Sequence, residues 1–205
     1  ATNRFFITMQ SKGSRPLPAF ARAFPTTPRI FVYRDPVQVL QSHLKDGPHA
    51  LCLHQTPPAI VAEAAARHQR HNVNKNQNPE DYCAAHLSSI TDAALEGMQD
   101  DVAYAVPLNY VDLPERLYEE IIPGILNLEV GPAELHRIHQ VAGQYSKGGG
   151  SGANGANAGT FTSDSETKSA TASQAVEDAA VSFLEESYEA LEEAAAEAKQ
   201  RFAQL

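Results

Sequence analysis

Long hydrophobic runs are absent from this sequence of 205 residues. No stretch approaches the roughly 18 consecutive apolar residues of a membrane-spanning helix, so we expect no transmembrane segment. The first ten residues, ATNRFFITMQ, neither begin with methionine nor have the layout of a signal peptide. This beginning predicts a processed chain or a fragment of something longer, soluble as given and of undetermined compartment. The 42 % apolar content suits one domain, with or without an appendage.

Cysteine is also scarce, since Cys52 and Cys83 are the two in the chain. A chain of this size does not need a disulfide staple, so we expect two buried free thiols, although the two could pair. A nucleophile elbow is missing too, and a Ser-His-Asp hydrolase is not expected. Because zinc needs three or four converging ligands, we expect no metal: the candidate ligands form incomplete sets, Cys52 with His54, His68 with His71, and His136 with His139.

Basic residues are outnumbered, since 16 Lys and Arg against 25 Asp and Glu give a formal charge of −9. Most of the excess lies between Ala172 and Leu205, where eight acids and two bases give −6. A nucleic-acid-binding protein needs a dense basic surface, so we expect no nucleic-acid partner. A helix from about Ala172 to Phe202 places the acids on one face, which is either solvated or binds a partner. Its apolar stripe is Val176, Ala180, Phe183, Ser187, Leu191, Ala195 and Ala198.

The central stretch of the chain is RIFVYRDPVQVLQS, from Arg29 to Ser42. Its first five residues are typical of a buried strand, and Pro36 suits the first turn of the helix that the following apolar spacing predicts. Ligands gather at the carboxyl ends of parallel strands, and helix N-termini favour anions. Arg34 at the strand end and Ser42 in the helix could therefore hold one phosphate from two sides.

The rest of the chain predicts a mixed order of strands and helices. The first 45 residues form a βαβ unit, which predicts a parallel sheet. Irregular segments are expected at Lys45–Pro58 and His68–Asn78, both rich in turn-forming or polar residues. Further strands are expected at Arg4–Met9 and Asp101–Leu108, and helices at Leu17–Phe24, Ala59–Arg70, Pro79–Met98, Pro114–Ile122 and Pro132–Tyr145.

The stretch RDPVQVLQS resembles the 3′-phosphate-binding motif of sulfotransferases that use 3′-phosphoadenosine-5′-phosphosulfate (PAPS). In that family an Arg is followed by Pro and, eight positions after the Arg, by a Ser, and Arg34 and Ser42 match this spacing. ARAFPTTPRIFVYRDP and LNYVDLPE (Leu108–Glu115) resemble a divergent microbial and algal branch. GQYSKG and FTSDSETK resemble its C-terminal region, where Lys147 and Gly148 would form a loop that closes over the 3′-phosphate. Together these segments cover most of residues 4–200.

The resemblance implies an α/β fold: a P-loop-NTPase-like three-layer sandwich with a parallel sheet, incomplete at its N-terminal side, plus a long C-terminal helix. On this basis we divide the chain into a partial domain at 1–147, a flexible Gly-rich loop at 148–159 and a C-terminal segment at 160–205 that packs back on the domain. The family's first strand is central in its sheet. Without that strand, exposed ladder edges would need cover from another segment, another chain or a rewired sheet.

Two parts of the family's machinery are not found in this chain. The loop that cradles the phosphosulfate lies on the family's first strand, and Ser11–Arg15 has cations but lacks the glycine spacing. The family's catalytic His would fall near Thr8–Ser11, where there is none. The candidate bases elsewhere are His43, beside Ser42, and His54, and His43 is the better placed of the two, though a weak candidate.

Two functions follow as hypotheses. The first is transfer of a sulfuryl group from PAPS to a hydroxyl or amine of a small-molecule or glycan acceptor, with Arg34, Ser42, Lys147 and Gly148 as cofactor-binding residues. The second is a catalytically inactive subunit, derived from the sulfotransferase fold, that binds protein partners in a larger assembly. The absent cradle and the missing His favour the second hypothesis, and the family resemblance favours the first.

Overall fold

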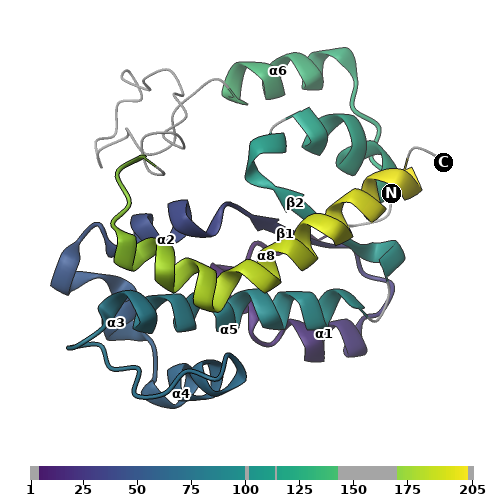
Figure 1. Ribbon diagram of the computed structural model, residues 1–205. Coiled ribbons are helices and arrows are strands. Elements are labelled where there is room, and N and C mark those ends of the chain that lie inside the picture. Colours follow the sequence, from purple (N-terminus) through teal and green to yellow (C-terminus); the bar gives the residue numbers. More distant parts are fainter. Residues whose placement is uncertain (1–4, 100–101, 114, 143–169, 203–205) are drawn as a thin grey trace.

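The computed structural model describes residues 5–99, 102–113, 115–142 and 170–202. The fold is mixed α/β and mostly helical, with a small parallel sheet and a long C-terminal helix (Figure 1). The helices are α1 (Leu17–Ala23), α2 (Pro36–Leu44), α3 (Leu51–Gln55), α4 (Pro58–Arg67), α5 (Pro79–Gln99), α6 (Pro132–Ala142) and α8 (Gln174–Phe202). Short 3-10 turns are η1 (Ser11–Ser14), η2 (Gly47–His49), η3 (Val102–Tyr104) and η4 (Tyr110–Asp112), and η5 (Leu117–Ile125) is π-helical.

Within the described residues the sheet has two strands, β1 (Arg29–Tyr33) and β2 (Ala105–Asn109), paired in parallel. The pairing runs from Arg29 opposite Ala105 to Tyr33 opposite Asn109. The strand expected at Arg4–Met9 is wrong for the described residues 5–9, which join no ladder and are exposed. The reason is that this segment has strand-forming residues but no backbone partner beside it. Within the described residues the sheet is parallel as expected, but its pairing joins β1 to β2 and not the two strands of the βαβ unit expected in the first 45 residues.

Helix α5 forms the centre of the core. Nine consecutive residues, Tyr82 to Ile90, are buried, as expected for a helix that is covered on all sides. It packs against α8, α1, α4 and α2, and Figure 1 shows α5 and α8 side by side. Gly97 permits the close approach of α1, because a Cβ there would lie 2.8 Å from Cγ of Leu17.

The amphipathic pattern expected for the C-terminal helix is confirmed by the burial of its side chains. All seven residues of the expected stripe are buried, with Phe183 1 % and Ala198 0 % exposed. The stripe packs on α5, α2 and β2, while most of the acidic side chains face solvent. No helix among the described residues is long and apolar enough to cross a membrane.

Two local expectations need correction. The segment Lys45–Pro58 is not wholly irregular, because η2 and α3 lie within it. The helix expected to stop near Pro123 continues to Ile125 as a π-helix with Pro123 inside it. Pro123 has no N–H to give to the helix, and the chain continues through it in the π-helical form.

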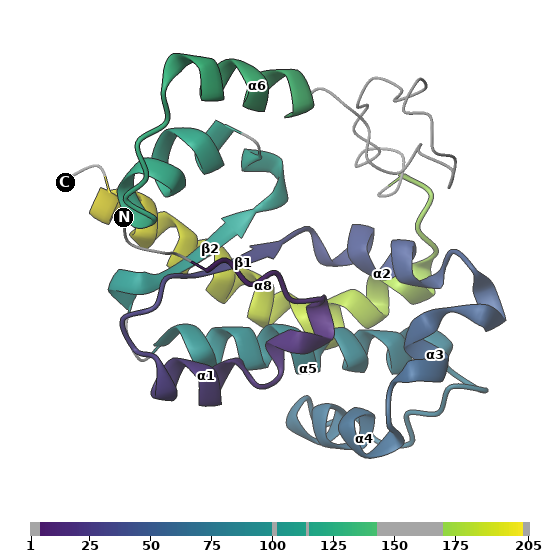
Figure 2. The ribbon, with the colours of Figure 1, turned by 180° about the vertical axis from the view of Figure 1, so that it is seen from behind.

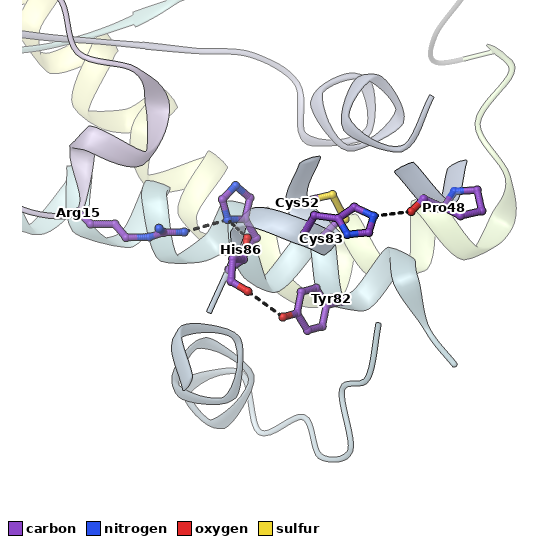
Figure 3. Close-up of a disulfide and its surroundings, with 8 residues drawn as sticks. Arg15, Pro48, Cys52, Tyr82, Cys83 and His86 are labelled. Carbon is purple, nitrogen blue, oxygen red and sulfur yellow. Dashed lines mark hydrogen bonds between the residues drawn. A yellow bond between two sulfur atoms is a disulfide. The ribbon is translucent and has the colours of Figure 1, made fainter. Parts of the chain in front are cut away.

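The two cysteines are paired, which corrects the expectation of free thiols. Cys52 on α3 and Cys83 on α5 form a disulfide with their Cα atoms 5.3 Å apart (Figure 3). Both residues are buried in the same core cluster. The missed element α3 explains the error, because it is this helix that turns Cys52 toward α5.

Reducing this disulfide should lower the free energy of unfolding by about 3–4 kcal/mol, because the bond closes a loop of 31 residues in the unfolded chain. Urea unfolding with and without dithiothreitol, followed by circular dichroism, measures the change. The double variant Cys52→Ala, Cys83→Ala serves as control and should respond to urea identically with and without reductant. An unchanged urea midpoint for the reduced native chain would contradict the expectation.

Candidate functional site

The carboxyl ends of β1 and β2 bring two distant sequence segments together. Because the strands are parallel and Tyr33 lies opposite Asn109, the next residues, Arg34 and Tyr110, leave the sheet at the same edge. The Arg34 guanidinium carbon lies 5.0 Å from the centre of the Tyr110 ring. This is the geometry of a cation–π contact. It places the RDP motif and the LNYVDLPE segment at one site.

Helix α2 begins at this site with a side-chain cap. Asp35 Oδ1 accepts a hydrogen bond from the backbone N–H of Gln38 at 2.9 Å, and Pro36 occupies the first turn. Arg34 Nε donates to Oε1 of Gln38 at 2.7 Å. The motif spacing therefore produces a capped helix with a cation beside its N-terminal turn.

Arg34 precedes α2 and bonds Gln38 in its first turn. Gln38 and Ser42, four apart within α2, lie one turn from each other. Ser42 is half-buried two turns into the helix. The structure thus places Arg34 before the cap of α2, bonded to Gln38, and Ser42 further along the same helix, and no described contact joins Ser42 to either. The other expected cofactor residues, Lys147 and Gly148, lie outside the described residues.

His43, the weak candidate for a catalytic base, lies at the edge of a large cavity. Its ring centre is 5.9 Å from that of His86 on α5. Burial lowers the pKa of His43 below its ordinary value, so the imidazole is neutral at pH 7. His54, the other histidine considered as a base, is exposed, and its Nε2 donates a hydrogen bond to the carbonyl oxygen of Pro48 at 2.8 Å.

His86 is a site residue that sequence reasoning missed. Nδ1 of His86 lies 2.8 Å from Nη2 of Arg15 and 2.8 Å from Oγ1 of Thr56 (Figure 3). An arginine can only donate, so Nδ1 accepts and the proton of the neutral ring is on Nε2. Burial, followed by the charges of Arg15, of His43 when it is protonated, and of Lys12, lowers the pKa of His86 to about 4. No sequence signal pointed here, because the contact joins residues 71 positions apart.

The turn Ser11–Arg15, weighed as a phosphate cradle, has another role. Arg15 donates from Nε to Oγ of Ser89 at 3.0 Å in addition to its contact with His86. The segment is a 3-10 turn that follows residues 5–10, which form no strand. It is therefore not the strand–loop–helix of a phosphate-binding loop, and its arginine is used against α5.

A cavity of about 1060 Å³ extends from this site along β1. Its walls are the segment 5–9, one edge of β1, and apolar residues of α1, α5 and α8. Arg34 and Tyr110 line it where the strands end, and His43 of α2 lines it as well. A cavity of this size suits a drug-sized ligand or a short peptide.

A polar cluster at the strand ends ties the sheet to α8. Glu192 Oε1 accepts hydrogen bonds from Tyr33 Oη and from Asn109 Nδ2, each at 2.6 Å. Burial and the Glu192 carboxylate raise the pKa of Tyr33, which keeps the phenol protonated as a donor. Tyr188 completes the group with an edge-on contact to Tyr33 at 5.8 Å. The cluster holds the two strand ends in register beneath Arg34 and Tyr110.

Histidine, serine and aspartate also meet elsewhere, without forming a hydrolytic site. His68 Nε2 lies 2.8 Å from Oγ of Ser88, which donates to Asp92 Oδ2 at 3.0 Å. Ser88 is 0 % exposed, so no substrate carbonyl can reach its oxygen. Asp92 bonds the serine instead of orienting the imidazole as a triad acid does. Within the described ranges no group of three or more potential ligands could hold a metal ion.

No family model, curated protein or solved structure matches this chain.

The low pKa of His86 predicts a pH-dependent stability. In the unfolded chain His86 takes up a proton near pH 6.5, whereas in the folded chain it stays neutral to about pH 4. The free energy of unfolding should therefore fall as the pH drops from 6.5 to about 4. His86 accounts for about 3 kcal/mol of this fall at most. Two-dimensional NMR of the imidazole Cε1–H signal measures the folded pKa, and urea unfolding across this range measures the loss.

The variant Arg15→Gln should raise the pKa of His86, because one of the nearby positive charges is removed while burial remains. The variant Arg22→Gln, at an exposed position of α1, is the matched control and should leave the titration unchanged. A His86 pKa near 6.5 in the native chain would contradict the assignment.

Proposed function

We propose that the carboxyl ends of β1 and β2 are the 3′-phosphate-binding half of a nucleotide site of the sulfotransferase type. The observation that carries the proposal is the stacking of Arg34 on Tyr110, since the motif that resembles the family's phosphate grip and the second resembling segment meet there. In this proposal the two-stranded sheet is part of a P-loop-NTPase-like three-layer sandwich. Transfer of a sulfuryl group from PAPS to a hydroxyl or amine is the corresponding activity.

The residues present fit a phosphate at this position. Arg34 lies beside the first turn of α2, where the backbone N–H groups and the helix dipole favour an anion. Arg34 and Ser42 would hold the 3′-phosphate, with Gln38 keeping the guanidinium aligned along the helix. The cation–π contact with the ring of Tyr110 also restricts the orientation of the guanidinium. Among the described residues the phosphosulfate end finds no comparable cradle, because Ser11–Arg15 is committed to α5.

His43 is the described residue best placed to accept a proton from the acceptor. PAPS supplies the sulfuryl group when bound, and the protein must take the proton that the acceptor hydroxyl loses. A neutral imidazole that lines the cavity can do this, and burial keeps His43 neutral at pH 7. The acceptor would lie in the apolar cavity beside it.

A non-catalytic interaction subunit is the second candidate. The observation that favours it is the exposure of large apolar side chains on the segment 5–9, with Phe5 91 % and Ile7 74 % exposed. Apolar patches of this kind mark interaction sites in soluble proteins. In this candidate Arg34 and Ser42 are remnants of the nucleotide site.

Binding of adenosine 3′,5′-bisphosphate to the full chain, measured by titration calorimetry, tests the first proposal. Arg34→Ala should weaken binding by about 10- to 100-fold, the value of a lost charge-assisted hydrogen bond, and Ser42→Ala by a few-fold. Arg22→Ala, at an exposed position of α1, is the matched control and should bind like the native chain. Equal affinity of the native chain and Arg34→Ala, with both folded by circular dichroism, would overturn the assignment.

A further inference from the structure

The segment 5–9 carries a row of apolar side chains that the fold leaves uncovered. Phe5, Phe6, Ile7 and Met9 are 91 %, 63 %, 74 % and 47 % exposed. Side chains of these types are usually buried, but residues 5–9 belong to no helix or strand of the described structure. Phe5 and Ile7 are the most exposed of the four. A patch of this kind indicates a surface that meets apolar material outside the chain.

The part of the chain around this patch is basic, although the protein as a whole is acidic. Residues 5–34 contain five Lys and Arg and no Asp or Glu, whereas the whole chain has a net charge of −9. Lys12, in the turn η1 that follows the segment, is exposed. A further exposed aromatic side chain, that of Phe24 at 54 %, follows the end of α1. Apolar and cationic side chains are thus combined in one stretch without a carboxylate.

The acidic residues gather on the opposite face of the molecule. Helix α8 has eight of the 25 acids of the chain against two bases, and most of these acids are exposed. In Figure 1 α8 lies in front of the strands, whereas in Figure 2, seen from behind, the segment that leads into η1 lies in front of them. The molecule therefore has an apolar face in a basic part of the chain and an acidic face on the other side.

A lipid surface with anionic headgroups matches both properties of the first face. It presents negative charge above an apolar layer, so it binds cations and apolar side chains together. The backbone of residues 5–9 has no ladder partner in the described structure, and at the level of the headgroups water can satisfy its N–H and C=O groups. A protein partner would need acidic and apolar groups arranged for this one face, whereas such a lipid surface supplies both everywhere.

We propose that the segment 5–9, together with Lys12, docks the protein peripherally on membranes that contain anionic lipid. Phe5 and Ile7 enter the layer below the headgroups, Lys12 lies among the headgroup charges, and the acids of α8 point away from the surface. Docking uses the outward side of the segment, and the cavity behind it keeps the role given to it above. This inference goes beyond both candidate functions and depends on neither.

The first test is flotation of the full chain with phosphatidylcholine vesicles that contain about one third phosphatidylglycerol. Binding should be about tenfold stronger than to vesicles of phosphatidylcholine alone, and added salt should weaken it because it screens the headgroup charge. Lys12→Gln should weaken binding by about fivefold. Lys199→Gln, at an exposed position of α8, is the matched control and should bind like the native chain. Absence of binding to the anionic vesicles would overturn the proposal.

The second test locates the inserted residues. The chain has no tryptophan, so Phe5→Trp introduces a single fluorophore in the patch. With anionic vesicles its emission should shift to the blue and be quenched by lipids brominated on their acyl chains. Val181→Trp, at an exposed apolar position of α8, is the matched control and should show neither change. Equal responses of the two variants, or no response of Phe5→Trp on vesicles that bind it, would overturn the proposal.

The third test separates a membrane from other occupants. The double variant Phe5→Ser, Ile7→Ser should bind anionic vesicles about tenfold more weakly or worse, whereas Leu51→Ser, Val181→Ser, at two exposed positions elsewhere, should bind like the native chain. Circular dichroism shows that both variants fold. A native dimer in light scattering that the first variant converts to a monomer would overturn the proposal in favour of a contact between two copies. Saturable binding of monomeric dihexanoyl-phosphatidylglycerol, as tight as that of vesicles, would overturn it in favour of an apolar ligand pocket.

Discussion

The burial of α5 on all sides is the constraint on which the rest of the structure depends. A helix with nine consecutive buried residues must also bury its polar side chains, and α5 carries His86, Ser88 and Ser89 among them. Each of these needs a partner, because an unpaired polar group in a core costs about 1–3 kcal/mol. The partners come from three separate segments of the chain. The polar groups of one helix thereby determine where its neighbours sit.

These partners lie on both sides of α5 and connect the core to the sheet. Arg15 and Thr56 meet His86, while His68 and Asp92 meet Ser88, with Ser187 of α8 donating to Asp92 at 2.7 Å. Helix α8 then reaches the strand ends through Glu192. The position of Arg34 and Tyr110 is in this way fixed by contacts that begin within the core.

Much of the helical structure could be predicted from local patterns. The stripe of α8 and the prolines that open α2, α5 and α6 are signals carried by neighbouring residues, and the helices lie where these signals place them. The error at residues 5–9 has a different origin, because a strand needs a partner as well as suitable residues. The cysteine pair was missed for a similar reason: α3 is five residues long, too short for periodicity to show, and it alone orients Cys52.

The candidate site also has some features that local sequence patterns predict and others that depend on residues distant in the sequence. The sequence predicted Arg34 at the end of a strand and Ser42 in the following helix, and β1 and α2 have these residues at those positions. Gln38 between them and the cap by Asp35 could have been found from the helical spacing. His86 could not, because its environment is made by Arg15 and Thr56, which no local pattern joins to it. Burial and charge, which set its pKa, are properties of the assembled core.

The Tyr33–Glu192 hydrogen bond spans 159 positions, and this separation bears on how the protein is made. Contacts between distant residues slow folding, because a long loop must close before they form. The strand ends are held by a helix that is synthesised well after β1 and β2, so the strands must wait, partly uncovered, until α8 has been made. During that interval the apolar residues of β1 and α5 are the surface that a nascent-chain chaperone would meet.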